Sequence, residues 1–104
     1  MNTKEISGFI NAEGKLTSLP SKKKKKILAL VRLAEQIPVN KEYSEKEFSD
    51  LLRTLHTFGD PATLRRELYD YFLINRELDG QRYCLNPECP SADALIAQYC
   101  GGNM

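Results

Sequence analysis

The stretch that decides the fold is residues 60–85, which read DPATLRRELYDYFLINRELDGQRYCL. Asp60 followed by Pro61 is typical of a helix start, because an acidic cap accepts a backbone hydrogen bond and proline suits the first helical position. The helix that follows has apolar residues at helical spacing, so one face is expected to be buried. That face comprises Leu64, Leu68, Tyr71 and Phe72.

After this helix the periodicity changes from that of a helix to that of a strand. Residues 74–78 and 81–85 flank the dipeptide Asp79-Gly80. Asp-Gly between two such runs predicts a two-residue hairpin, because a type I′ turn needs positive φ at both of its central positions.

Upstream, Ser44-Glu45-Lys46-Glu47 is a capping box that predicts a second helix over about residues 45–56. Its apolar face is expected to consist of Phe48, Leu51, Leu52 and Leu55. Glu42-Tyr43 precedes it as a short extended piece, and residues 57–59 form the turn after it.

An earlier helix is expected to begin with Ser21 as its N-cap and to end near Gln36, before Pro38. Its apolar residues cover a wide stripe, which predicts a central position in the core. The stripe consists of Ile27, Leu28, Leu30, Val31, Leu33, Ala34 and Ile37.

The two ends complete one expected domain over the 104 residues, which have a mass of 11.8 kDa. Residues 1–20 are interpreted as an N-terminal arm that packs onto the domain, with a short strand around residues 15–17. Residues 21–85 form the core. Residues 86–104 form a tail in which Ser91 caps a short amphipathic helix closed by Gly101-Gly102.

The order helix, short strand, helix, turn, helix, hairpin is that of a winged helix-turn-helix. We therefore predict an α+β, mainly helical fold with three helices plus a β-hairpin wing, an N-terminal arm and a short C-terminal helix. In that fold the third helix enters the major groove of DNA, and the wing touches the backbone or the minor groove.

The chain also resembles the bacterial "domain of unknown function 2087" family. The resemblance covers about residues 9–84 and is most specific in the block from Leu64 to Tyr71. Its other motifs are Gly14-Lys15-Leu16, Leu19-Pro20 with the lysines, Tyr43 to Glu47, Ala62-Thr63, Arg76, Asp79-Gly80 and Tyr83. The resemblance implies a cytoplasmic winged-helix-like domain, found alone or attached to helix-turn-helix transcriptional regulators, and it implies no established activity. Two features depart from it: Ser49 stands where the family often has Asn, and the tail after Leu85 lies outside the pattern.

Ten cationic and aromatic residues are candidates for contact with nucleic acid. Arg65, Arg66 and Tyr69 lie on the face of the third helix that would read DNA, where arginine binds guanine or phosphate. Alternatively, Arg66 pairs with Asp70 while Arg65 is a solvated surface residue. Arg76 and Arg82 bracket the hairpin as candidate wing contacts, or else pair across strands with Glu77 or Asp79. The lysine run supplies the other candidates, namely Lys22, Lys23, Lys24, Lys25 and Lys26.

The charge distribution leaves two functions open. Net charge is only +1, but residues 1–33 carry eight Lys/Arg against two Asp/Glu, whereas residues 60–84 carry four against five. A nucleic-acid-binding module that takes duplex DNA is the first hypothesis. The second is a protein-interaction module on the same scaffold that lacks DNA binding and takes a protein partner or a second copy of itself.

Other functional classes are not expected. The longest apolar run has five residues, from Ile27 to Val31, and the N-terminus leads into no apolar signal core, so we expect no membrane segment and a cytoplasmic location. Three cysteines, Cys84, Cys89 and Cys100, favour free thiols, and a zinc site would need a fourth ligand when His56 is the only histidine. No phosphate loop, paired-carboxylate motif or nucleophile elbow occurs, so neither a cofactor nor an enzymatic activity is expected.

Overall fold

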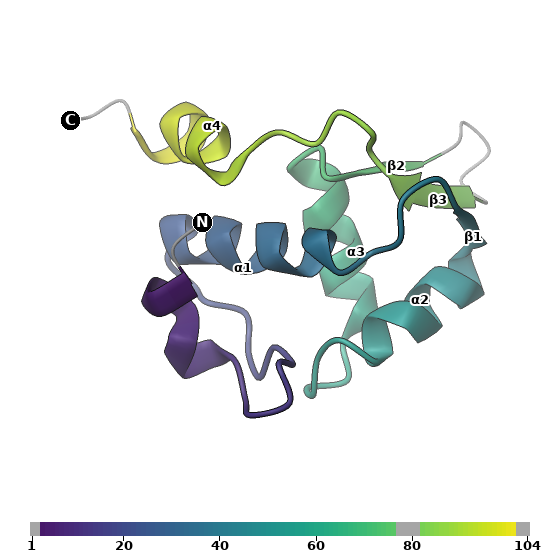
Figure 1. Ribbon diagram of the computed structural model, residues 1–104, viewed down its shortest axis with the longest axis horizontal. Helices are drawn as coiled ribbons and strands as arrows, with labels where there is room; N and C mark the ends of the chain where they lie inside the picture. Colours follow the sequence, from purple (N-terminus) through teal and green to yellow (C-terminus); the bar gives the residue numbers. More distant parts are fainter. Residues whose placement is uncertain (1–2, 77–81, 102–104) are drawn as a thin grey trace.

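The computed structural model describes residues 3–76 and 82–101, with the side chains of residues 6–76 and 82–100. Its elements, in chain order, are η1 (Thr3–Phe9), α1 (Lys23–Glu35), β1 (Glu42–Ser44), α2 (Glu45–Arg53), α3 (Pro61–Asp70), β2 (Ile74–Arg76), β3 (Arg82–Leu85), α4 (Ala92–Ile96) and η2 (Ala97–Gly101). The fold is α+β, with helices α1 to α4 and one three-stranded antiparallel sheet, as the order of elements predicts (Figure 1).

Helix α1 lies between the N-terminal helix η1 and α4, and seven of its residues from Ile27 to Ala34 are buried (Figure 1). Its predicted cap was wrong by one residue. Lys22 occupies the N-cap position in an extended conformation and makes no side-chain capping bond, so the helix starts without the Ser21 cap. The expected central position of α1 in the core is confirmed.

The starts of α2 and α3 follow the predicted local signals. The Ser44 hydroxyl accepts a hydrogen bond from the Glu47 backbone N–H at 3.1 Å, and the Glu47 carboxylate accepts one from the Ser44 N–H at 2.9 Å. At α3, the Asp60 carboxylate accepts from the Thr63 N–H at 3.2 Å, with proline at the start of the helix. Helix α2 ends at Arg53, three residues earlier than predicted.

The sheet has the strand order β1-β3-β2. Tyr43 lies opposite Tyr83 in the β1–β3 pair, and Ile74 lies opposite Leu85 in the β2–β3 pair. The short strand before α2 therefore pairs with the hairpin, an arrangement consistent with a winged-helix-like fold. The predicted Asp79-Gly80 turn lies outside the described residues.

The end of α3 corrects one predicted core residue. Phe72 was expected to be buried, but its side chain is 54% exposed. The helix ends with Tyr71 as C-cap, and Phe72 takes a left-handed conformation with φ of 64°. The Phe72 and Leu73 N–H groups donate to the carbonyls of Tyr69 and Leu68, at 3.0 and 2.9 Å. This Schellman-type ending breaks the helical periodicity, so Phe72 points away from the core while Leu73 enters it.

The arm and the tail both contribute to the core, where Ile6, Leu16 and Leu95 are almost fully buried. In place of a regular strand at residues 15–17, Leu16 makes isolated bridges with Ile10 and with His56. The predicted Ser91 cap is confirmed, since its hydroxyl accepts from the Ala94 N–H at 3.0 Å. None of the helices in the described ranges has the length and apolar content needed to cross a bilayer.

Candidate functional site

Helix α3 presents one face to the core and the opposite face to solvent. Leu64, Leu68 and the C-cap Tyr71 are buried, so the period of the helix turns Arg66 and Tyr69 outward. Arg65 and Glu67 lie on the two flanks between these faces and are partly buried. The predicted site residues of this helix therefore have two different environments: Arg65 lies on a partly buried flank, and Arg66 and Tyr69 lie on the exposed face.

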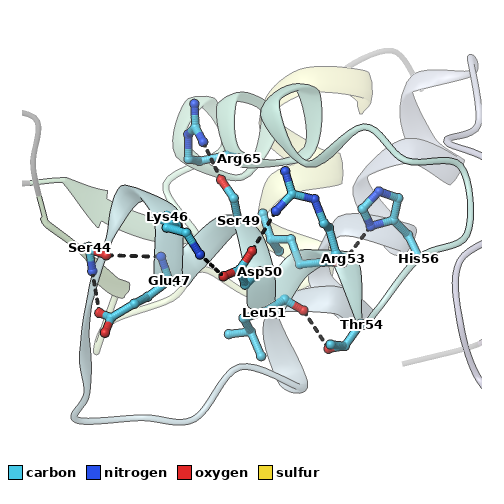
Figure 2. Close-up of polar contacts among 11 residues, drawn as sticks. Ser44, Lys46, Glu47, Ser49, Asp50, Leu51, Arg53, Thr54, His56 and Arg65 are labelled. Carbon is cyan, nitrogen blue, oxygen red and sulfur yellow. Dashed lines mark hydrogen bonds and ion pairs between the residues drawn. The ribbon is translucent and has the colours of Figure 1, made fainter.

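Arg65 is held inside the fold, with only 20% of its side chain exposed. Its Nη1 donates a hydrogen bond to the Ser49 hydroxyl at 2.8 Å (Figure 2). Its Nη2 lies 3.6 Å from a Glu45 carboxylate oxygen. The guanidinium also stacks over the Tyr83 ring at 5.5 Å from the centroid. Arg65 thus joins α3 to α2 and to β3, and it is not the solvated surface residue considered as an alternative.

Arg66, its neighbour in sequence, is exposed. The alternative in which Arg66 pairs with Asp70 is wrong, since no ion pair or hydrogen bond joins these two described residues. Within the described part of the chain, no carboxylate is paired with the Arg66 guanidinium.

Arg76 on β2 is stacked over the Tyr69 ring, with its guanidinium carbon 5.3 Å from the ring centroid. Tyr69 is 44% exposed. Arg65, Arg66, Tyr69 and Arg76 line one pocket of about 470 Å³ between α3 and the sheet, together with Ala62, Thr63, Asp70 and Tyr83. We call it the arginine pocket. The structure therefore brings together four of the ten predicted site residues.

Arg82 lies outside the arginine pocket. Its Nη1 donates to a Glu42 carboxylate oxygen at 3.0 Å, which ties β3 to β1 at the surface. The cross-strand partners considered from the sequence, Glu77 and Asp79, lie outside the described residues.

The lysine run surrounds the start of α1. Lys22, Lys23 and Lys24 are exposed, and Lys25 and Lys26 are partly buried. Lys26 Nζ lies 3.6 Å from a Glu67 carboxylate oxygen, so the end of the run is beside the α3 flank opposite the arginine pocket. Lys24 instead lines a groove of about 640 Å³ between α1 and residues 89–96, which we call the tail groove.

On the exposed face of α2, one carboxylate is shared by two cations. Asp50 accepts a hydrogen bond from Lys46 Nζ at 3.0 Å and from Arg53 Nη1 at 2.7 Å (Figure 2). The hydrogen bond from Lys46, with the positive charges of both partners, holds the pKa of the Asp50 carboxyl below its usual range. We call these three residues the α2 network.

His56 has both ring nitrogens in use. Its Nδ1 donates to the Leu52 carbonyl at 2.6 Å, and its Nε2 accepts from the Asp60 backbone N–H at 2.9 Å. The carbonyl can only accept and the amide can only donate, which assigns the neutral tautomer with its proton on Nδ1. The hydrogen bond to Leu52 joins the His56 ring to the last turn of α2, and the role of His56 is structural.

Cys84, Cys89 and Cys100 form no disulfide within the described part of the chain. Cys89 Sγ donates to the Leu73 carbonyl at 3.2 Å, and burial raises the pKa of this thiol. No group of His, Cys, Asp and Glu in the described ranges has the geometry to hold a metal ion.

Sequence reasoning missed the residues that support the site. Ser49, Tyr83 and Glu45 hold Arg65, and Glu67 holds Lys26. Only Ser49 had a usable signal, because it lies three residues before the buried Leu52 and so on the inner side of α2. Pairing between elements that are far apart in sequence left no comparable pattern for the other three.

The comparisons with known proteins bear on the part of the chain that holds α1 to α3 and the sheet. No curated protein and no solved structure matches the chain. The model of a family described as an uncharacterised protein conserved in bacteria matches residues 15–85, which include all ten predicted site residues. The chain therefore belongs to the DUF2087 family.

Proposed function

We propose that this protein is a cytoplasmic DNA-binding module that lays the exposed face of α3 against duplex DNA. The observation that carries the proposal is the Lys26–Glu67 contact at 3.6 Å, since it brings the lysine run beside α3. On the other flank of the helix, the stacking of Arg76 on Tyr69 holds a second cation. Cations thus flank the helix face on both sides, which is the distribution that phosphate contacts on either side of a groove require.

The residues divide into different roles in this proposal. Arg66 and Tyr69 project from α3 and would meet the DNA surface. Lys22, Lys23 and Lys25 would neutralise phosphates. Arg65 is a positioning residue, since two of its nitrogens already contact Ser49 and Glu45. Arg82 contributes less because Glu42 offsets its charge.

The test is binding of a random-sequence duplex, measured by fluorescence anisotropy across a salt series. Affinity should fall with salt, by roughly 0.9 log unit per log unit of salt for each phosphate contacted. The triple variant K22Q/K23Q/K25Q should bind more weakly to every sequence and should flatten that slope by about one to three units.

A matched control is K41Q/K46Q/R53Q, which removes three cations from exposed positions just before β1 and on α2. It should retain the affinity and slope of the unmodified chain. Equal losses in the two triple variants would show that only net charge matters, and absence of binding at low salt would overturn the proposal for this chain.

A second candidate function is a protein-interaction module, and the tail groove favours it. This groove is lined largely by apolar side chains, among them Leu28, Val31, Leu73, Leu85 and Ile96. It lies partly in residues beyond the family match, which ends at residue 85. A chain that fails to bind duplex DNA and elutes as a dimer would favour this candidate.

A further inference from the structure

The arginine pocket has the charge and size of a small-ligand site. Three arginines, Arg65, Arg66 and Arg76, line a volume of about 470 Å³. Among the described residues that line it, Asp70 is the one carboxylate, and Glu45 at 3.6 Å offsets Arg65. These described residues leave a positive balance from Arg66 and Arg76. Its volume lies within the range of roughly 300–1,000 Å³ typical of small-molecule sites, so it has room for more than a single oxyanion.

The stacked arginines are prepared for a ligand. Arg76 over Tyr69 and Arg65 over Tyr83 form two arginine–tyrosine pairs, at 5.3 and 5.5 Å. Stacking uses the face of a guanidinium and leaves its in-plane N–H groups available. The guanidinium nitrogens of Arg65 contact Ser49 and Glu45. No described side chain accepts a hydrogen bond from Arg66 or Arg76. Two guanidinium forks thus remain for an anion, and one of them is already ordered by its tyrosine.

Planar guanidinium forks match the oxygen geometry of phosphate. The other polar groups suit what a phosphate ester would carry. The Asp70 carboxylate is an acceptor for sugar hydroxyls, and Thr63 and the tyrosine hydroxyls can donate or accept. An isolated carboxylate at the rim would repel a bare anion but would bind the hydroxyl groups of an attached sugar.

We propose that the arginine pocket binds a phosphorylated sugar, either as a free sugar phosphate or nucleotide or as a nucleotide unit of a nucleic-acid strand. Arg66 and Arg76 hold the phosphate, and Asp70 accepts from the sugar. This site deepens the proposed function, since it would make the α3 face a binder of individual nucleotide units, but it does not require duplex binding.

The experiment titrates the full chain with ribose 5-phosphate, thymidine 5′-monophosphate, inorganic phosphate and unphosphorylated ribose. Binding is followed by calorimetry and by the backbone amide shifts of α3 and β2 in NMR spectra. Ribose 5-phosphate and the mononucleotide should bind saturably, more tightly than inorganic phosphate, and ribose should not bind. In R66Q/R76Q the affinity for both phosphate esters should fall by about tenfold or more, since charge-assisted hydrogen bonds are lost.

The matched control is K46Q/R53Q, which removes two cations from the α2 network and should leave binding unchanged. D70A should weaken ribose 5-phosphate but not inorganic phosphate. Circular dichroism checks that each variant keeps its melting temperature. Unchanged binding in R66Q/R76Q, or equal affinity for inorganic phosphate and ribose 5-phosphate, would overturn the proposal.

A duplex arm separates this site from the proposed function. If duplex DNA binds while ribose 5-phosphate and the mononucleotide do not, the pocket is not a phosphate-ester site although the DNA proposal stands. If the phosphate esters bind and duplex DNA does not, the pocket is confirmed as a site for a free phosphorylated ligand, and the DNA proposal fails.

Discussion

The exposed faces of α2 and α3 carry similar residues but use them differently. On α2, Asp50 accepts hydrogen bonds from both Lys46 and Arg53, so the positive and negative charges meet one another. On α3, Arg66 and Asp70 have the same four-residue spacing as Lys46 and Asp50, yet they do not pair. The comparison teaches that sequence spacing alone does not show which charged side chains are available to a ligand. A side chain is available only when its N–H donors are not already bonded to a carboxylate of the protein.

The largest effect should separate the two neighbouring arginines of α3. Arg65→Ala removes the bond to Ser49, the Glu45 ion pair and the stacking on Tyr83. It should lower the free energy of unfolding by about 1–3 kcal/mol, since hydrogen bonds from charged groups are worth this much. Arg66→Ala should change it by less than about 0.5 kcal/mol because the side chain is exposed. Urea denaturation measures both.

A swap at the partner residue sharpens this result. Ser49→Ala should reproduce part of the Arg65→Ala loss, whereas Ser49→Asn keeps a side-chain acceptor and should lose less. Equal stability of the Arg65→Ala and Arg66→Ala variants would contradict the division between a structural and an exposed arginine.

A second effect concerns how the two helices end. Helix α2 ends with Thr54 in a right-handed conformation, whereas α3 ends with Phe72 at φ of 64°. A left-handed conformation costs a residue with a Cβ atom roughly 1–2 kcal/mol, a cost that glycine avoids. Phe72→Gly should therefore raise the free energy of unfolding by about 1 kcal/mol, as seen in thermal or urea unfolding.

Asn40→Gly is the matched control, since Asn40 is also exposed and has φ of 57°. Asparagine tolerates this conformation better than phenylalanine, so its gain should be smaller. A loss of stability in Phe72→Gly would show that the packing of the half-exposed ring outweighs the backbone strain.

The smallest effect is a titration within the α2 network. With its two cations present, the pKa of the Asp50 carboxyl is below its ordinary value of 3.8. These ion pairs stabilise the fold at pH values above 3.8, the ordinary pKa. Their contribution is lost as the pH falls through the lower pKa of the folded state. In K46Q/R53Q the pKa should return toward 3.8, as measured by NMR titration of the carboxyl carbon. Arg66→Gln should leave it unchanged.

The sequence predicted the starts of α2, α3 and α4 better than the ends of α2 and α3. The Ser44 and Ser91 caps and the Asp60-Pro61 start are local signals, in which a side chain binds a backbone group within three residues. The end of α3 carries no such signal. Phe72 occupies the left-handed position that follows a helix, where glycine is the usual residue and marks the end in a sequence. The prediction from helical periodicity therefore wrongly included Phe72 in the buried face of α3.

The candidate site was predicted in part for the same reason. Helical periodicity is enough to turn Arg66 and Tyr69 toward solvent. The partly buried position of the Arg65 side chain depends on Ser49 and Tyr83, which belong to α2 and β3. The Lys26–Glu67 contact likewise joins residues of α1 and α3, so no local pattern could have shown it.

The bridge between Leu16 and His56 has a consequence for where this domain can be cut. The Leu16 N–H donates to the Leu55 carbonyl at 3.0 Å, and the Thr57 N–H donates to the Leu16 carbonyl at 2.9 Å. Leu16 therefore holds the turn between α2 and α3 through two backbone hydrogen bonds. The family match begins just before it, at residue 15. A shorter version that starts at the first residue of α1 would retain every candidate contact residue on α3 and the sheet, yet it would release the turn that aims them. An N-terminal boundary for expression or fusion should therefore lie before Leu16.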